Sequence, residues 1–305
     1  MGICIPTFKR YEQLEKCINE CINSICNVKT KDVKIDICVI DNECSNKVLE
    51  IVNFYKGIYH NVWYFKEELK GYSFIRNACL KTAEKFSWDY LAFIDDDEFP
   101  SENWINALIQ KALETNADIV LGRVEPVYDE GAPRWMVKTK YHRKYLSEKM
   151  VANISIGYCR SDNVLIKLSS FKNTKFDLNF NVLGSEDFKF FYDSHMTSRK
   201  NIQWEPKAVT YERIPIERTT LLYNMLRAFN IGRAHALFDK AKYQRNGTQI
   251  FIIFKGIINI VLGLLKYVHA IFLNKEKRYK ELCLISRGFG RIIGSFYKYN
   301  SISTK

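Results

Sequence analysis

The sequence lacks the signatures of several common protein classes. It contains no internal repeat and no low-complexity linker. Its nine cysteines follow no regular framework, and Cys17, Cys21 and Cys26 have neither a zinc-ligand spacing nor a nearby histidine. These absences exclude a repeat array, a disulfide scaffold and a structural zinc domain. They predict buried thiols in a reducing compartment.

Targeting signals are absent as well. A strand-like segment, Ile3–Ile5, begins almost at once, with no charged segment followed by an apolar one as in a secretory signal. Pro6 stands where a myristoylation motif requires Ser or Thr. We therefore expect the protein to stay in the cytoplasm.

The charge of the chain is unevenly distributed. The net charge is +12, but residues 213–305 hold 17 lysines and arginines against 4 acidic residues, a balance of +13. The remaining residues are nearly neutral. With 47% hydrophobic and 26% charged residues the composition is that of a folded protein. A basic tail of this kind suits nucleic acid, anionic lipid or an acidic partner.

Apolar periodicity predicts the fold of the first 130 residues. Strand-like segments alternate with helix-like ones, an order typical of a parallel, doubly wound sheet. The predicted strands are Ile3–Ile5, Ile35–Ile40, Val62–Phe65, Tyr90–Ile94 and Asp118–Leu121. The predicted helices carry the stripe Leu14 to Ile25, the segment Val48–Tyr55, a start near Ser73, and Trp104–Glu114.

The second half of the chain has a looser pattern. Lys138–Lys149 is charged and predicts a surface loop, whereas Asn163–Lys167 and Ala208–Tyr211 are strand-like. A helix is expected after Glu186 and Asp187. From Arg218 onward the pattern is helical, with a break at Gly247. We therefore expect a catalytic domain over residues 1–215 and a basic helical region over 216–305.

Four acidic residues, Asp95 to Glu98, directly follow the apolar strand Tyr90–Ile94. Adjacent carboxylates repel one another, and burial adds to the cost unless a cation neutralises them. Their hard oxygens suit Mg²⁺ or Mn²⁺. The carboxyl end of a strand in an open α/β sheet is also where ligands bind. The run therefore predicts a metal and diphosphate site.

Three other features fall at strand ends and allow two interpretations each. Asp41 can bind a base or form a turn. Arg76, on the first turns of the helix after Gly71, can meet a diphosphate or remain solvated. Glu186 and Asp187 open a helix, where one carboxylate can act as a general base or both can cap the helix.

Five motifs occur in order: Ile5–Arg10, Val39–Asn42, Gly71–Asn77, Phe93–Glu98 and Gly184–Asp187. Together they resemble the family 2 glycosyltransferases of GT-A fold, over roughly residues 1–215. The resemblance implies an α/β fold with a Rossmann-like, mostly parallel central sheet flanked by helices, followed by a C-terminal helical appendage. It also implies a hexosyltransferase of bacterial cell-surface glycan type, making polysaccharide or lipopolysaccharide.

The resemblance also implies a role for individual residues. Residues from four of the motifs would bind the donor. They are Pro6, Thr7, Arg10, Asp41, Arg76, Asp95 and Asp96. Asp41 would bind the base, Arg76 would lie near the diphosphate and Asp95 would approach the ribose. Asp97 would hold Mn²⁺ or Mg²⁺ between the phosphates. Asp187 would be the base of an inverting reaction, assisted by Glu186.

One position departs from the family pattern. Many members present a metal-binding histidine after the last core strand, where this chain has Glu212. Glu212 is the candidate replacement, although the position can also lie off the metal. None of the five histidines has a ligand-pair spacing. Trp135 is expected either in the sugar and acceptor pocket or in the core.

The apolar segment 250–273 is interrupted by Lys255 and Lys266. The uncharged stretch Gly256–Leu265 has 10 residues, fewer than the roughly 20 needed to span a bilayer. We expect an amphipathic helix lying on an anionic membrane, with a tilted span or a packed helix as alternatives. Residues 250–291 would then bind the inner face of the cell membrane.

The expected function is transfer of a sugar from a nucleotide-diphosphate donor, with UDP as the expected nucleotide, to a glycan or lipid-linked glycan. The sequence allows two alternative functions, and features of the chain disagree with each. A sugar-nucleotide nucleotidyltransferase would require a glycine-rich loop after the first strand, and Pro6 to Arg10 contain no glycine. A nucleic-acid-binding protein disagrees with the neutral body and apolar tail, so no nucleic-acid partner is expected.

Overall fold

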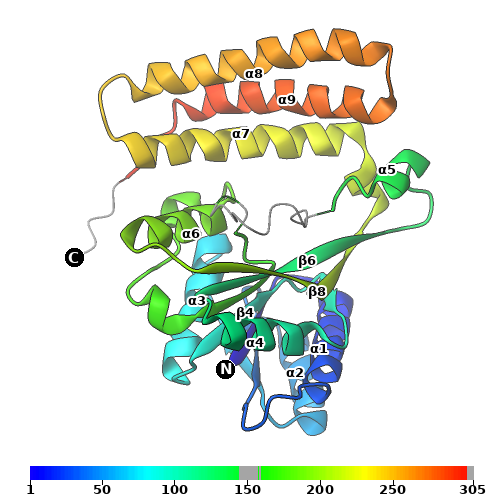
Figure 1. The fold of residues 1–305 in the computed structure, drawn as a ribbon, viewed down its shortest axis with the longest axis vertical. Coiled ribbons are helices and arrows are strands. Elements are labelled where there is room, and N and C mark those ends of the chain that lie inside the picture. Colours follow the sequence, from blue (N-terminus) through cyan, green and yellow to red (C-terminus); the bar gives the residue numbers. More distant parts are fainter. Residues whose placement is uncertain (144–156, 158, 301–305) are drawn as a thin grey trace. The chain divides into compact units, whose positions relative to one another are not determined.

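A computed structural model describes residues 1–143, 157 and 159–300 of the chain (Figure 1). Contacts divide these residues into two compact units. Unit 1 comprises residues 1–127, 142–177 and 186–213, and unit 2 comprises residues 128–141, 178–185 and 214–305. Because unit 2 includes two short segments inserted along the chain, the units are not simple N- and C-terminal halves.

An eight-stranded sheet in the order β3-β2-β1-β4-β7-β6-β8-β5 forms the centre of unit 1. Its first half is parallel and has strands β1 (Gly2–Thr7), β2 (Asp36–Asp41), β3 (Val62–Lys66) and β4 (Tyr90–Ile94). Helices α1 (Tyr11–Cys26), α2 (Asn46–Ile58) and α3 (Tyr72–Lys85) connect these strands. All six residues of β1 and of β2 are buried, as expected for strands covered on both faces.

The second half of the sheet is antiparallel. Strand β7 (Asn163–Lys167) pairs with β4 on one side and with β6 (Ile119–Tyr128) on the other. The long strand β8 (Ile202–Ile214) pairs with the short strand β5 (Glu98–Pro100). The sheet is therefore mixed. Strand β6, which follows α4 (Trp104–Thr115), is again parallel to β4, and β7 lies between these two strands in the opposite direction.

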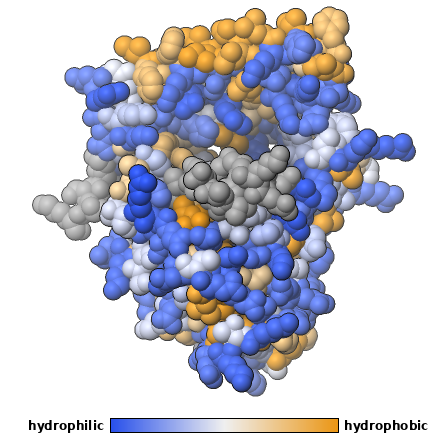
Figure 2. Space-filling view, viewed as in Figure 1, coloured by the Kyte–Doolittle hydropathy of each residue, from blue (hydrophilic) through white to orange (hydrophobic). Residues whose placement is uncertain are grey.

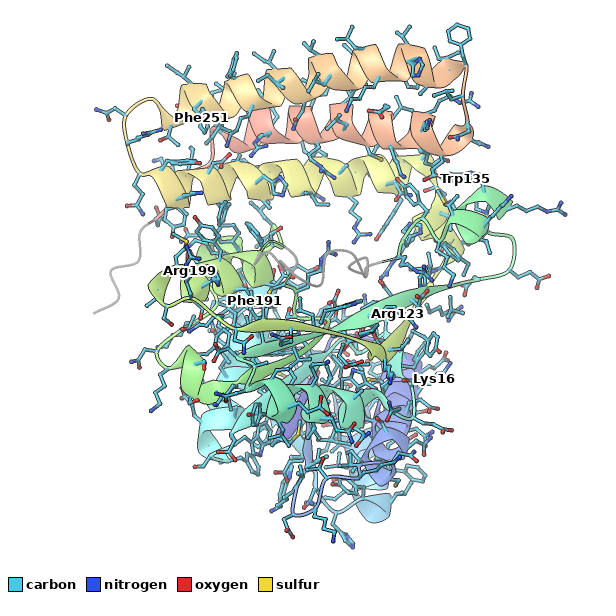
Figure 3. The ribbon with its side chains drawn as sticks, viewed as in Figure 1. Lys16, Arg123, Trp135, Phe191, Arg199 and Phe251 are labelled. Atoms are coloured by element: carbon cyan, nitrogen blue, oxygen red, sulfur yellow. The ribbon has the colours of Figure 1, made fainter. Side chains whose placement is uncertain are left out.

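Two apolar clusters cover the two faces of the sheet. Side chains alternate along β1, so Ile3 and Ile5 join one cluster and Cys4 joins the other. The first cluster is covered by α1, α2 and α4, and the second by α3 and α6 (Glu186–Thr197). Phe191 of α6, labelled in Figure 3, belongs to the second cluster. Seven of the nine cysteines are buried, in agreement with the prediction of buried thiols.

Unit 2 is largely helical. Its long helices are α7 (Leu221–Tyr243), α8 (Thr248–Ile271) and α9 (Lys275–Gly294), joined by short turns. It also contains α5 (Arg134–Thr139) and the short 3-10 turns η4 (Leu178–Phe180) and η5 (Ile216–Thr219), while η3 (Leu168–Phe171) belongs to unit 1. Glycines let the helices approach closely: a Cβ on Gly290 of α9 would lie 1.9 Å from the carbonyl oxygen of Phe229 on α7.

Several sequence expectations can be compared with these elements. The α/β sheet with a helical C-terminal region is confirmed, and Gly247, with φ of 85°, separates α7 from α8. Part of the expected loop Lys138–Lys149 lies at the end of α5, and residues 144–149 fall outside the described residues. Trp135 packs edge-on against Tyr141 and against Tyr279 of α9, within unit 2 (Figure 3). Trp135 is partly buried by these contacts, and its place in a sugar and acceptor pocket stays a prediction.

Candidate active site

Asp96, in the middle of the acidic run, ties the end of β4 to the end of β1. Its carboxylate accepts hydrogen bonds from the Thr7 hydroxyl at 2.8 Å and from Arg10 at 2.7 Å. The β1–β4 pairing brings these two strand ends to the same edge of the sheet. Because Asp96 is buried, its pKa rises to about 6, although Arg10 opposes that rise. The structure thus gives Asp96 a role in holding the loop after β1.

Arg10 also contacts the next carboxylate. Its guanidinium lies 2.7 Å from Asp96 and 3.0 Å from Asp97. Burial opposes the charge of Arg10, but the two carboxylates outweigh burial and raise its pKa. The Arg10 side chain is 40% exposed, whereas those of Asp96 and Asp97 are 5% and 14% exposed. Arg10 therefore partly neutralises the negative charge of the acidic run.

Asp41, at the end of β2, is fully buried and forms the following turn. One oxygen of its carboxylate accepts from the backbone amide of Glu43, and the other accepts from Ser45 and from the Tyr64 hydroxyl. These contacts are those of a turn-forming aspartate. Binding of a base by Asp41 stays a prediction. Pro6, also assigned to the donor, is buried inside β1 opposite Ile40.

Arg76 lies inside the protein and not on a solvated helix turn. It donates to Asp95 of the acidic run and, at 3.0 Å, to the Ser161 carbonyl. Its guanidinium stacks 5.4 Å from the Phe93 ring centroid. Burial disfavours the charge of Arg76, yet Asp95 raises its pKa. The expected position near a diphosphate is untested, but the pairing with Asp95 connects α3 to the acidic run.

Glu186 and Asp187 begin α6, and their charges interact with Arg76. Burial raises the pKa of Glu186 to about 8, and the neighbouring Asp187 adds to this shift. Burial also raises the pKa of Asp187, opposed chiefly by Arg160. Arg76 counteracts both shifts. At neutral pH one proton is therefore favoured on Glu186, while Asp187 next to two arginines is the better candidate for the ionised carboxylate.

Glu212 lies on β8 directly opposite Glu98 of β5. Both residues are buried, and Thr210 donates to Glu98 at 2.8 Å. Asn163 donates to Thr210 and accepts from the Trp104 indole, which extends this polar chain into the core. The pairing brings Glu212 to the strand that directly follows Asp97. Its role as a metal ligand remains a prediction.

The chemistry of these residues suits a divalent cation. Asp95 and Asp97 offer hard carboxylate oxygens and are partly exposed. Within residues 1–143, 157 and 159–300, no group of three or more His, Cys, Asp or Glu side chains is arranged to hold a metal. Mg²⁺ commonly uses one or two carboxylates and completes its shell with water and substrate phosphates. The residues therefore fit a cation that binds together with a diphosphate.

Sequence reasoning missed the residues that shape the loop before α3. The side-chain amide of Asn42 donates to the carbonyls of Glu67 and Leu69 and accepts from Gly71. Lys70 donates to the Asn42 carbonyl. Asn42 belongs to the motif Val39–Asn42, but the sequence pattern assigned it no role. Arg160 and Ser161 carried no signal at all, because their importance depends on being brought beside Asp187 and Arg76.

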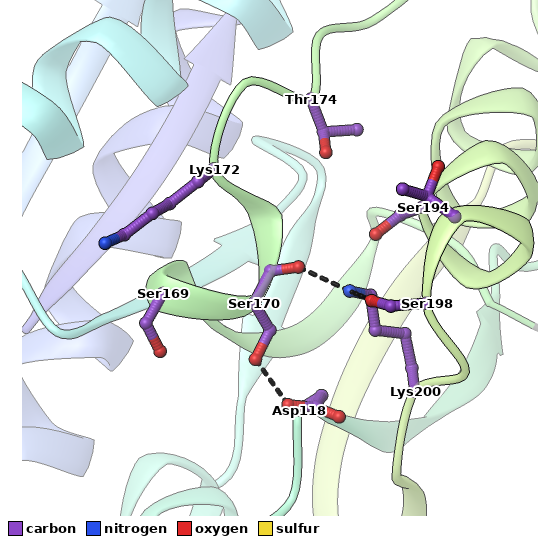
Figure 4. A pocket seen from close by; sticks show the side chains of 9 residues that line it. Asp118, Ser169, Ser170, Lys172, Thr174, Ser194, Ser198 and Lys200 are labelled. Atoms are coloured by element: carbon purple, nitrogen blue, oxygen red, sulfur yellow. Dashed lines mark hydrogen bonds between the residues drawn. The ribbon is translucent and has the colours of Figure 1, made fainter.

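A separate polar pocket of about 230 Å³ lies near the ends of β6 and β7 that are remote from the acidic run (Figure 4). The register of β4 with β7 sets Ile94 opposite Asn163 and Tyr90 opposite Lys167, so the segment after β7 lies away from the acidic run. Ser170 donates to Asp118, and Lys200 donates to the Ser170 carbonyl and to Ser198 at 2.7 Å. These bonds connect the end of α6 to the sheet.

The chain belongs to glycosyl transferase family 2, whose model matches residues 2–174. It is 28% identical over 254 residues to the succinoglycan biosynthesis protein ExoM of Rhizobium meliloti, covering 82% of this chain and 78% of that protein. It is 24% identical over 203 residues to a poly(ribitol-phosphate) beta-glucosyltransferase of Bacillus spizizenii, covering 66% of this chain but 30% of that protein. The protein is therefore a glycosyltransferase with relatives in cell-surface glycan synthesis.

Solved structures show the same fold. The complex of S. aureus TarS residues 1–349 with UDP matches all of this chain and 94% of that one, with a TM-score of 0.52 and 19% identity. The mannosyltransferase PcManGT of Pyrobaculum calidifontis, with GDP-Man and Mn²⁺, matches 94% of this chain and 85% of that one, with a TM-score of 0.58 and 12% identity. The fold is the GT-A fold.

Proposed function

We propose that this chain transfers a sugar from a UDP-sugar to a hydroxyl of a cell-surface glycan or lipid-linked glycan, with inversion at the anomeric carbon. The observation that carries the proposal is the linkage of two carboxylate groups within unit 1. Arg76 bonds Asp95 of the acidic run and interacts with Glu186 and Asp187 of α6. The carboxylate proposed for the donor and those proposed for the acceptor thus interact with the same arginine.

The donor side is assigned to the acidic run. Asp97 would hold Mn²⁺ or Mg²⁺, with Asp95 toward the ribose and Glu212 as an additional ligand. When bound, the cation supplies Lewis-acid stabilisation of the charge on the departing diphosphate. Arg10 would exchange its contacts with Asp96 and Asp97 for the phosphates, which keeps the local charge balanced. The TarS complexes contain UDP and UDP-GlcNAc, which supports uracil as the base.

The acceptor side is assigned to Asp187. A hydroxyl attacking the anomeric carbon must lose its proton, and a carboxylate with a raised pKa holds that proton well. Asp187 is separate from the acidic run in sequence and on a different element, so it need not bind the cation. Glu186, with its proton retained, would orient Asp187 and the acceptor without adding a second negative charge.

The two domains are proposed to have different roles, sugar transfer and membrane association. Residues 1–215 would carry out the transfer, and the basic region 216–305 would associate with the inner face of the cell membrane through residues 250–291. A lipid-linked acceptor would then be concentrated near the enzyme. Among the described residues, α8 is the one helix long and apolar enough to cross a membrane by length and composition.

The donor and the base can be tested separately. Thermal unfolding with a panel of nucleotide sugars and Mn²⁺ should show the largest stabilisation with a UDP-sugar, because a ligand that binds the folded state raises the melting temperature. Asp187→Asn should keep that stabilisation and lose transfer to an acceptor by about 10³-fold or more. Stabilisation by GDP-sugars alone would contradict the donor, and full transfer by Asp187→Asn would contradict the base.

A further inference from the structure

The two faces of α8 differ in the size of their side chains. The buried residues of α8 lie along one side of the helix, and most of them are small. They are Thr248, Ile252, Gly256, Gly263 and Ala270. The exposed residues at the opposite positions are large and apolar. They are Ile250, Phe254, Ile257, Val261, Leu264, Leu265 and Val268, followed by Phe272 directly after the helix. At about 100° per residue, the second set spans roughly 100° of the helix surface.

This exposed stripe of α8 is unusual for a folded protein. Only 22% of its most apolar 18-residue window is buried. Figure 2 shows the apolar side chains gathered along α8 at the top of the view, with hydrophilic side chains below them. A continuous apolar strip along a 24-residue helix marks a surface that contacts another apolar phase or molecule.

The inner face of α8 is fastened to α7 and α9. Lys255 contacts Asp239 of α7 at 3.2 Å, and Arg291 of α9 contacts the same carboxylate at 2.7 Å. Asp239 is buried, so this ion triad joins all three helices inside unit 2. A Cβ on Gly256 would lie 2.9 Å from the Gly288 carbonyl oxygen, which shows how closely the α8 and α9 backbones approach.

This attachment argues against a spanning helix. If α8 crossed the bilayer, α9 would enter the hydrocarbon with it, because Gly256 and Gly263 of α8 pack on α9 along their shared length. Eight of the 20 residues of α9 are charged. Charged side chains are strongly disfavoured at the bilayer centre. Detaching α8 alone would instead break the triad at Asp239.

Two partners for the stripe remain, a second copy of this chain and a membrane surface, and charge favours the membrane. Residues 213–305 carry a balance of +13, and exposed Lys275 and Lys277 follow directly after α8. A second copy of the same basic surface would be repelled, whereas anionic lipid headgroups attract it. The segment Thr248–Asn274 contains no acidic residue.

We infer that α8 lies flat in the headgroup region of an anionic bilayer, with the stripe from Ile250 to Phe272 facing the acyl chains and the ion triad facing away. The inference rests on the proposed function in naming the membrane as the partner. It adds the orientation of α8, excludes a span, and identifies which side chains enter the lipid. The basic residues at the start of α9 contact the headgroups.

The test compares two double variants in vesicle flotation with the full-length protein. Val261→Glu/Leu265→Glu places charges on the stripe, where these side chains are 47% and 66% exposed. The matched control, Phe54→Glu/Ile58→Glu, makes the same changes at the same spacing on α2, where the side chains are 66% and 59% exposed. All four positions are solvent-facing, so both variants should fold, which thermal unfolding checks.

The wild-type protein and the α2 variant should float with phosphatidylglycerol-containing vesicles, and binding to pure phosphatidylcholine should be weaker. The α8 variant should bind the anionic vesicles about tenfold less or weaker still, because each new charge opposes burial in lipid. Bound wild-type protein should be released by alkaline carbonate. Retention after carbonate would establish a span, and a soluble dimer that the α8 variant dissociates would establish a second copy. Either result overturns the inference.

Donor turnover in solution separates this inference from the proposed function. With a soluble donor and no vesicles, the α8 variant should hydrolyse the donor as the wild type does, because the substituted residues belong to unit 2 and the proposed site belongs to unit 1. Vesicle binding without any donor turnover would overturn the proposed function alone. Donor turnover without vesicle binding would overturn the placement of α8 alone.

Discussion

At the scale of single residues, the four adjacent carboxylates have different surroundings. Asp95 pairs with Arg76, Asp96 with Thr7 and Arg10, and Glu98 with Thr210. Asp97 is 14% exposed and contacts the exposed Arg10. Residues that are neighbours in sequence therefore serve different parts of the fold. This division predicts that substitutions in the run separate activity from stability.

Asp97→Ala should lower metal-dependent donor hydrolysis by about 10²-fold or more, because it removes the proposed cation ligand. It should change stability little. Asp96→Ala should instead lower the free energy of unfolding by about 1–3 kcal/mol, because it leaves the buried Thr7 hydroxyl without its acceptor and removes one of the two carboxylates that pair with Arg10. Urea unfolding and a donor hydrolysis assay check the two effects. Full metal-dependent turnover by Asp97→Ala would contradict the assignment of the metal.

Glu186→Gln should become more stable relative to the wild type as the pH rises. The pKa of Glu186 is raised from 4.5 to about 8, so the folded protein favours its neutral form. Stability from that raised pKa is fully present below pH 4.5 and is lost as the pH rises through about 8. Glutamine cannot ionise, so the difference should be small at pH 5 and on the order of a few kcal/mol at pH 9.

Thermal unfolding of both proteins between pH 5 and pH 9 measures this difference. Asp187→Asn in the same series is the control for the neighbouring charge, because Asp187 contributes to the shift at Glu186. Its effect should be to lower the pKa of Glu186. A Glu186→Gln difference that does not change with pH would show that Glu186 is already ionised in the folded protein.

At the scale of elements, unit 2 depends on glycines at helix crossings. Gly290→Ala should destabilise it by about 1–3 kcal/mol or more, because the new Cβ would lie 1.9 Å from the Phe229 carbonyl oxygen, which is backbone and cannot move aside cheaply. The control is Gly57→Ala on α2, where a Cβ meets nothing within 4 Å and helix propensity favours alanine by up to about 1 kcal/mol.

Denaturant unfolding followed by far-ultraviolet circular dichroism measures both substitutions, because α7, α8 and α9 contribute much of the helical signal. Equal effects of Gly290→Ala and Gly57→Ala would show that α7 and α9 can separate without cost. The same assay bears on α8, since Gly256 and Gly288 contact each other in the neighbouring crossing.

The elements also show where sequence patterns were sufficient. Leu14, Cys17, Ile18, Cys21 and Ile22 of α1 are buried as their spacing predicts. Strand β8 runs from Ile202 to Ile214 and is longer than the predicted Ala208–Tyr211, although Ile202 to Glu205 also alternate between apolar and polar residues. The antiparallel pairing of β7 between β4 and β6 was missed. Strand direction follows from the path of the connecting chain, and local periodicity does not record that path.

At the scale of the whole molecule, the two compact units should respond to different ligands. The proposed donor site lies in unit 1, whereas the exposed stripe of α8 lies in unit 2. A UDP-sugar with Mn²⁺ at about 100 times its dissociation constant should stabilise unit 1 by about 2.7 kcal/mol. Anionic vesicles should stabilise unit 2. Differential scanning calorimetry should therefore show two transitions, each shifted by one ligand, and a single transition shifted equally by both would contradict this division.

The sequence by itself determined the family, the α/β fold, the residues of the five motifs and the apolar, basic character of residues 250–291. These depend on residue order and spacing over a few turns or strands. Only the tertiary structure decided that Arg76 pairs with Asp95, that Asp41 forms a turn, and that Lys255 faces Asp239 instead of lipid. The two ion pairs join residues 19 and 16 positions apart, whereas the turn at Asp41 was one of two conformations that its local sequence allowed. Local spacing does not record which distant residues packing brings together, and burial in a medium of low dielectric strengthens each ion pair. The acidic run was readable from sequence, whereas the partners that distinguish its four carboxylates depended on which strand ends the fold brought together.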